Sequence, residues 1–188
     1  MNVTTFFVSY IFIVSIVKLW CRRTVAASLF LYPLSRLGPA CYLWDFLRRS
    51  GQGGYFLPLS GGRDSASVAC IVFSMCRLVC QAVAGKDLKV LSDVQTIVGA
   101  PDYVPVDPRE LCSRLFFTCY LSTVNSSSET QERAAAFAEQ IGSYHLSFPI
   151  DTAVSAVIGI FQGATQLMPR FRVNGGEKRE NLALQNVQ

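Results

Sequence analysis

Residues 55–65, YFLPLSGGRDS, decide the fold of this 188-residue chain. The apolar run 55–59 is typical of a short buried strand, and an amphipathic helix pattern follows the glycines. Its apolar residues recur at steps of three and four: Val68, Val72, Met75, Val79 and Val83. The two glycines let the backbone turn sharply and approach an anion closely. Unpaired N–H groups at the start of the helix, with the hydroxyls of Ser60 and Ser65, can then hold a pyrophosphate.

Asp64 follows the two glycines and is negatively charged, so it cannot attract phosphate itself. A carboxylate beside bound phosphates is a natural ligand for a Mg²⁺ ion that the phosphates also bind. The alternative interpretation is an ordinary strand-to-helix turn with a serine or aspartate cap. The flanking strand and helix, and the Asp64-Ser65 ending, favour the phosphate-binding interpretation.

The composition indicates one folded domain without a nucleic-acid-binding surface. Hydrophobic residues make up 51% of the chain and charged residues 16%, which excludes a disordered chain, and the length suffices for one domain with a core. The net charge of +4 is concentrated in residues 1–59, whereas the part that carries the glycines is close to neutral. Because a nucleic-acid partner needs a basic stripe, we expect none.

Seven cysteines and a single histidine, His145, do not form the tight local ligand sets of a structural zinc site. Most of the cysteines fall inside apolar patterns, which is typical of buried free thiols in a reducing compartment. We therefore expect a cytoplasmic protein.

Residues 1–17 carry no charge and are strongly apolar, and Lys18, Arg22 and Arg23 follow them. A secretory signal has its positive charges before the apolar run, so this order argues against one. About 20 apolar residues are needed to span a bilayer comfortably, which makes the run short for an anchor. Residues 1–35 are therefore either a membrane anchor that leaves the rest in the cytosol, or a segment foreign to a domain that begins at residue 36. We favour the second interpretation.

Residues 36–188 alternate predicted helices and strands. Besides the helix after the glycines, helices are predicted at residues 39–49, 87–98, 129–141, 152–165 and from 181 onward. Further strands are predicted at 115–121 and 143–150, and loops at 103–108 and 168–180. This alternation indicates an α/β fold with a doubly wound parallel sheet. Ligands of such sheets bind at the carboxyl ends of the strands, where Ser60 and Asn125 are both expected.

Several segments of residues 36–188 resemble the synthetase domain of glutamine-dependent NAD⁺ synthetase. They are residues 38–41 (GPAC), 43–50 (LWDFLRRS), 58–62 (PLSGG), 107–109 (DPR), 125–127 (NSS) and 179–188 (RENLALQNVQ). The Ser-Gly-Gly-x-Asp-Ser motif alone resembles that of the wider class of PP-loop ATP pyrophosphatases. The segments 107–109 and 179–188 narrow the resemblance from that class to NAD⁺ synthetase. It implies a PP-loop-type sheet, incomplete at the C-terminus, in the N-terminal part of an NAD⁺ synthetase domain.

The resemblance also implies a reaction and roles for named residues. ATP adenylates the nicotinate carboxylate of deamido-NAD⁺ and releases pyrophosphate, and ammonia then displaces AMP to form the amide of NAD⁺. Such a reaction depends mainly on charge stabilisation and positioning. By the resemblance Ser60 is the catalytic serine, Asp64 contacts Mg²⁺, and Asn186 and Gln188 contact deamido-NAD⁺. The implied ATP loop comprises Pro58, Leu59, Ser60, Gly61, Gly62, Arg63, Asp64 and Ser65.

In the family that these segments resemble, ammonia comes from glutamine through an amino-terminal glutaminase domain, and the full-length enzymes are homo-oligomers. The chain shows no glutaminase domain, so we expect a fragment that carries the ATP site and is incompetent alone. Two alternatives stay open. One is a non-catalytic truncated isoform, tethered to a membrane by residues 1–17 or free of it, and the other is part of a different PP-loop ATP-dependent ligase.

Overall fold

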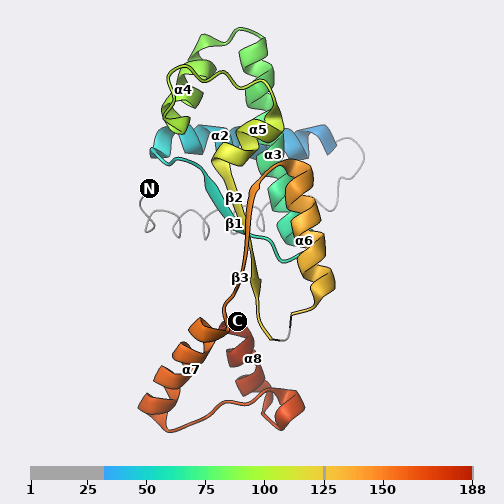
Figure 1. Ribbon diagram of the computed structural model, residues 1–188, viewed down its shortest axis with the longest axis vertical. Helices are drawn as coiled ribbons and strands as arrows, with labels where there is room; N and C mark the ends of the chain where they lie inside the picture. Colours follow the sequence, from blue (N-terminus) through green and yellow to red (C-terminus); the bar gives the residue numbers. More distant parts are fainter. Residues whose placement is uncertain (1–31, 125, 188) are drawn as a thin grey trace. The chain divides into compact units, whose positions relative to one another are not determined.

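The computed structural model describes residues 32–124 and 126–187 (Figure 1). These residues divide into two compact units. The first holds the described residues up to Tyr120 together with Ser128–Leu146, and the second holds the described residues of Leu121–Ser127 and of the stretch from Ser147 onward. The apolar run 1–17 lies outside the described residues, and so do Asn125 and Gln188.

A parallel sheet organises the fold, with strands β1 (Tyr55–Pro58), β2 (Phe116–Ser122) and β3 (Tyr144–Pro149) in the order β1-β2-β3. β1 and β2 pair in parallel, with Tyr55 beside Phe116. The predicted α/β class and the three predicted strands are confirmed, each within one or two residues of its predicted ends. The strands lie in the sheet in the same order as in the chain. A doubly wound sheet reverses this order at one point, and the described residues contain no such reversal.

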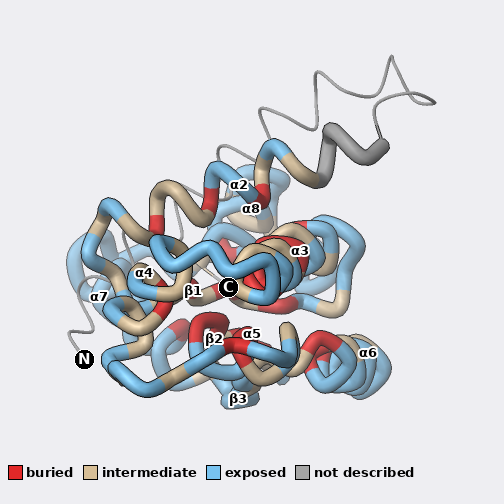
Figure 2. The backbone as a smooth tube through the Cα atoms, turned by 90° about the horizontal axis from the view of Figure 1, so that it is seen from above, coloured by how far each residue is buried: buried red, intermediate tan, exposed pale blue. Residues whose placement is uncertain are grey.

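Helix α3 (Arg63–Ala84) is the centre of the first unit. It contacts β1 and four helices, which are α2 (Tyr32–Ser50), α4 (Leu88–Val98), α5 (Pro108–Leu115) and α6 (Ser128–Ile141). Val68, Val72, Met75 and Val79 are buried as predicted, whereas Val83 is half-buried. Figure 2 shows buried residues on α3, α5 and β2, which line this core.

Among the described residues, α3 is also the one helix long and apolar enough to cross a membrane by length and composition. Its buried residues belong to the hydrophobic core and pack with those of α2, α5 and the strands. The apolar character of α3 is therefore accounted for by this core.

The predicted start of the first helix at Pro39 is wrong. α2 begins at Tyr32, and Pro39 lies inside it. A proline is best tolerated in the first turn of a helix, which is why the sequence predicts a start there. Beyond Pro39 the helix is fixed by packing, because Ala40, Leu43 and Leu47 are buried in the core, and tertiary packing outweighs such local preferences.

Helix α5 is not among the predicted helices. It overlaps the predicted loop 103–108 only at Pro108 and the predicted strand 115–121 only at Leu115, and residues 103–107 form a loop as predicted. Asp107 caps the helix by accepting a hydrogen bond from the Arg109 N–H at 2.9 Å, and Pro108 occupies the first turn. The buried residues Leu111 and Leu115 follow at helical spacing. An Asp-Pro pair before such spacing is a helix start signal, so the sequence does contain the information for α5.

The second unit contains α7 (Asp151–Thr165), the 3₁₀ turn η1 (Arg172–Asn174) and α8 (Lys178–Val187). α7 agrees with the prediction, but the predicted loop 168–180 contains η1 and the first residues of α8. α8 begins early because the Glu180 carboxylate accepts a hydrogen bond from the Glu177 N–H at 2.7 Å. In α7 and α8 only Val154 and Leu184 are buried among the described residues.

Candidate functional site

The turn that joins β1 to α3 is closed by its own serines. The Ser65 hydroxyl lies 3.2 Å from the Ser60 hydroxyl, accepts the Ser60 N–H at 3.3 Å and donates to the Gly62 carbonyl at 3.1 Å. The Gly62 N–H donates to the Ser60 hydroxyl at 3.3 Å. The residue before the turn, Leu59, donates its N–H to the Cys119 carbonyl of β2 at 2.7 Å. The turn therefore has a defined shape and is anchored to the sheet.

The two glycines of the turn are not equivalent. Gly61 has φ +74°, and a Cβ there would lie 2.4 Å from the carbonyl oxygen of Thr130 in α6. Gly62 has φ −90°, and a Cβ there would meet only the Ser60 hydroxyl, at 3.2 Å. The backbone conformation and the close approach of α6 therefore demand glycine at position 61 alone. Gly61 thus makes the predicted sharp bend, whereas Gly62 has a backbone conformation that other residues adopt, and its close approach to an anion stays a prediction.

The start of α3 is open. Gly62 is its N-cap residue, and no side chain caps the helix. The first N–H groups of a helix have no partner inside the helix. Those of Arg63, Asp64 and Ser65 therefore form, with the positive end of the helix dipole, a place suited to an anion. The alternative of a serine or aspartate cap at this turn does not describe the structure.

Asp64 lies in the first turn of α3 with its side chain exposed. No group of three or more histidine, cysteine or acidic side chains gathers for a metal anywhere in residues 32–124 or 126–187. Mg²⁺ in nucleotide sites commonly binds one or two carboxylates together with phosphate oxygens. A single exposed carboxylate beside an anion-binding helix start fits such an ion and does not fit a metal held by protein ligands alone.

The residues predicted to contact deamido-NAD⁺ are only partly described. Asn186 lies on α8 of the second unit with an exposed side chain, and Gln188 lies outside the described residues. Within the first unit the structure thus brings together the predicted loop residues 58–65, and it does not test a role for Asn186.

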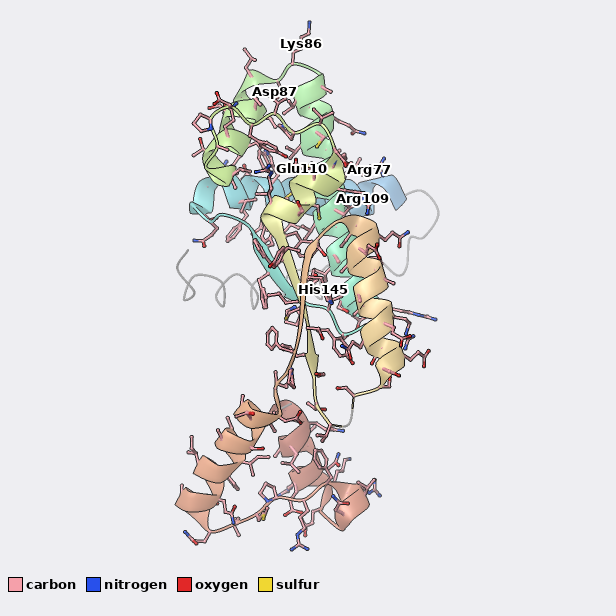
Figure 3. The ribbon with its side chains drawn as sticks, viewed as in Figure 1. Arg77, Lys86, Asp87, Arg109, Glu110 and His145 are labelled. Carbon is pink, nitrogen blue, oxygen red and sulfur yellow. The ribbon has the colours of Figure 1, made fainter. Side chains whose placement is uncertain are left out.

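The Asp-Pro-Arg segment has two structural roles, of which its sequence pattern signals only the cap of α5 and not the contact of Arg109 with α6. Asp107 caps α5, and the Arg109 guanidinium donates to the Glu139 carbonyl near the end of α6 at 2.7 Å (Figure 3). Gly142, just after α6, has φ +74°, and a Cβ there would lie 2.8 Å from the Arg109 Cβ. The segment therefore joins the start of α5 to the end of α6.

A small polar cluster surrounds Thr118, which is fully buried in β2. Its hydroxyl lies 2.9 Å from Nδ1 of His145 and 2.9 Å from the Ser143 hydroxyl. Burial lowers the pKa of His145, so its neutral form is favoured. His145 lies on β3, within the strand predicted at residues 143–150.

The cysteines agree with the predicted buried thiols in four cases. Cys76, Cys80, Cys112 and Cys119 are buried and free, and the hydrogen bond between the Cys76 thiol and Cys112, together with burial, raises the pKa of Cys76. The prediction is wrong for Cys41 and Cys70, which are exposed. They follow the apolar pattern in sequence but lie on the solvent side of α2 and α3.

No family model matches the chain. Glutamine-dependent NAD(+) synthetases from Rattus norvegicus and Mus musculus are 61% and 62% identical to it over 152 residues, which is 81% of this chain and 21% of each relative. The enzyme of the same name from Homo sapiens is 59% identical over 152 residues.

A crystal structure of a glutamine-dependent NAD(+) synthetase from Cytophaga hutchinsonii matches with a TM-score of 0.65 at 25% identity. The match covers 80% of this chain and 26% of that one. The chain spans about a fifth of the length of the curated relatives it matches. Over the matched residues, the chain is therefore a homologous segment of the glutamine-dependent NAD(+) synthetase family.

Proposed function

We propose that this chain carries the ATP-binding part of an NAD⁺-forming ligase, in which ATP activates deamido-NAD⁺ for amidation. The observation that carries the proposal is the turn between β1 and α3, which is closed by Ser60 and Ser65 and leaves the start of α3 without a side-chain cap. Such a helix start binds phosphate groups. Relatives with about 60% identity that bear the name of this ligase support this choice of reaction.

In this proposal the loop residues 58–65 hold the phosphates of ATP. The exposed Ser60 hydroxyl lies just after the carboxyl end of β1, where it can donate to a phosphate oxygen. The N–H groups of Arg63, Asp64 and Ser65 supply further donors at the helix start. Asp64 contributes a carboxylate oxygen to Mg²⁺, and the ion when bound offsets the negative charge that develops on the departing pyrophosphate.

The remaining assignments follow the relatives. Asn186 and Gln188 contact deamido-NAD⁺, ammonia derives from glutamine, and the enzyme works as a homo-oligomer in the cytoplasm. The domain itself begins near residue 36 in this proposal, and the apolar segment before it is not part of it.

The test is a titration of the 188-residue protein with ATP, with and without Mg²⁺, followed by calorimetry and thermal unfolding. Saturation with ATP at about 100 times its Kd should stabilise the fold by about 2.7 kcal/mol. Asp64→Asn should remove most of the Mg²⁺ dependence of ATP binding, because the amide is a weaker ligand than the carboxylate. Asp102→Asn, which changes an exposed aspartate in the segment between α4 and α5, is the matched control and should bind as the wild type does.

An assay with ATP, Mg²⁺, deamido-NAD⁺ and ammonium tests the reaction. NAD⁺ formation supports the ligase. ATP binding without NAD⁺ formation keeps the assignment of the loop and contradicts catalysis by this chain alone, which is the outcome expected both of a fragment and of a non-catalytic isoform. The same assay with a different acid in place of deamido-NAD⁺ tests the third alternative, because amidation of that acid would identify another PP-loop ligase. If ATP changes neither the heat of mixing nor the unfolding temperature, the assignment of the loop is wrong.

A further inference from the structure

Strand β2 and helix α6 support the glycine turn from outside. The carbonyl of Thr130, in the first turn of α6, lies so close to Gly61 that a Cβ at position 61 would be 2.4 Å from it. The Thr130 hydroxyl lies 2.7 Å from the hydroxyl of Tyr120 at the end of the buried part of β2. The Tyr120 side chain is only 4% exposed. One partly buried hydrogen bond therefore fixes the part of α6 against which the turn lies.

The neighbouring residue of β2 acts on the same turn. The Cys119 carbonyl accepts the Leu59 N–H at 2.7 Å, directly before Ser60. Two successive residues of β2 thus hold the turn: Cys119 through the backbone at its entry, and Tyr120 through Thr130 at Gly61.

We infer that Tyr120 and Thr130 are positioning residues for the ATP loop. The inference rests on the proposed function of that loop. A tyrosine hydroxyl in a buried site needs a hydrogen-bond partner, and Thr130 provides it. Neither residue touches the nucleotide in this scheme. Their hydrogen bond fixes the position of α6, and the contact with α6 fixes the position of Gly61. The turn then holds the N–H donors at the start of α3 in one orientation. Preorganised donors of this kind bind an anion without the cost of ordering a loop.

The first test measures, without nucleotide, hydrogen exchange of the backbone amides of Leu59, Ser60 and Gly62, which donate the hydrogen bonds of the turn. Tyr120→Phe and Thr130→Val each remove the hydroxyl pair and should speed this exchange about three- to tenfold, which is the factor expected for the loss of one hydrogen bond. Thr130→Ser keeps a hydroxyl and should exchange as the wild type does. The double variant should match the single ones, because both changes remove the same interaction.

Tyr55→Phe is the matched control. It also removes a buried tyrosine hydroxyl, which donates to the Leu43 carbonyl at 2.6 Å, but at the end of β1 that lies away from the turn. It should lower the free energy of unfolding by a similar amount. The exchange rates of the turn amides, divided by the rate of exchange through global unfolding, should stay unchanged. A merely structural role for Tyr120 would make the two tyrosine variants alike.

The second test is the Kd of the 188-residue protein for MgATP. The Tyr120→Phe and Thr130→Val variants should bind about three- to tenfold more weakly, and the Thr130→Ser and Tyr55→Phe variants as the wild type does. If the wild type binds no MgATP, the proposed function fails, and the exchange rates still decide whether Tyr120 positions the turn. Exchange in Tyr120→Phe that equals that in Tyr55→Phe overturns the inference. So does unchanged MgATP affinity in Tyr120→Phe when the wild type binds.

Discussion

Replacing Gly61 by alanine should destabilise the first unit more than any other single methyl group added in the turn. The left-handed backbone at φ +74° costs an alanine roughly 1–2 kcal/mol. The added Cβ would lie 2.4 Å from the Thr130 carbonyl, and a backbone oxygen cannot move aside as a flexible side chain can. Ordinary contact begins at 3.4 Å, so the turn or α6 must shift, at the roughly 1–3 kcal/mol typical of overpacking. We expect a total of about 2–5 kcal/mol.

Two other glycines separate these contributions. Gly99, the residue after α4, has φ +72°, and a Cβ there would meet nothing within 4 Å, so Gly99→Ala should show the backbone cost alone, about 1 kcal/mol. Gly62→Ala has a permitted φ of −90° and only the Ser60 hydroxyl nearby, so it should stay within about 0.5 kcal/mol of the wild type. Urea unfolding of the three variants measures the order. Equal losses for Gly61→Ala and Gly99→Ala would refute the contact with α6, and equal losses for the two adjacent glycines would refute the geometry of the turn.

Three further predictions concern other parts of the first unit. Asp107→Ala should cost about 1 kcal/mol in urea unfolding and Asp107→Asn much less, because asparagine can still cap α5; equal losses contradict the cap. Burial lowers the pKa of His145 from 6.5, so the unfolded chain binds its proton more readily and stability should fall as the pH drops below about 6.5. His145→Asn should flatten this fall in stability below about pH 6.5, and an unchanged dependence of stability on pH would contradict the lowered pKa of His145. Burial raises the pKa of Cys119 from 9.0 to about 11, so its contribution to stability is complete below about pH 9 and is lost as the pH rises toward 11. At about pH 8, iodoacetamide should label exposed Cys41 and Cys70 and spare Cys119 by mass spectrometry, and equal labelling would contradict its burial.

The sequence predicted correctly those helices whose first and last residues are determined by neighbours in the chain. Helix α4 begins after its cap residue Asp87 and ends before Gly99 in the left-handed region, as the residues predict. Helix α2 differs at its start. Ala40, Leu43 and Leu47 recur at helical spacing and pack in the core inside the predicted helix 39–49, whereas the turns of α2 before Pro39 carry no such local signal.

The candidate site shows the same division. The Ser-Gly-Gly-x-Asp-Ser motif predicts where an anion would bind, since the glycines, the serines and the helix start are neighbours in sequence. It could not predict that only Gly61 lies against another helix. That contact is made by Thr130, which follows β2 in the sequence and is far from the motif. Arg109 likewise belongs to a recognisable motif, but its bond to the Glu139 carbonyl depends on the packing of α5 beside the end of α6.

The support of the turn by β2 gives a physical reason why a parallel sheet suits a phosphate loop. A loop held only by its own serines would have to order on binding, and that ordering would reduce affinity. Parallel pairing places the carboxyl end of β2 beside that of β1, so the Cys119 carbonyl reaches Leu59 and the Tyr120 side chain reaches the first turn of the next crossover helix. The strand that contributes no residue to the predicted motif is therefore the one that fixes its shape. Substitutions at Tyr120 should accordingly weaken nucleotide binding through the turn, whereas substitutions at Tyr55 on the motif's own strand should not.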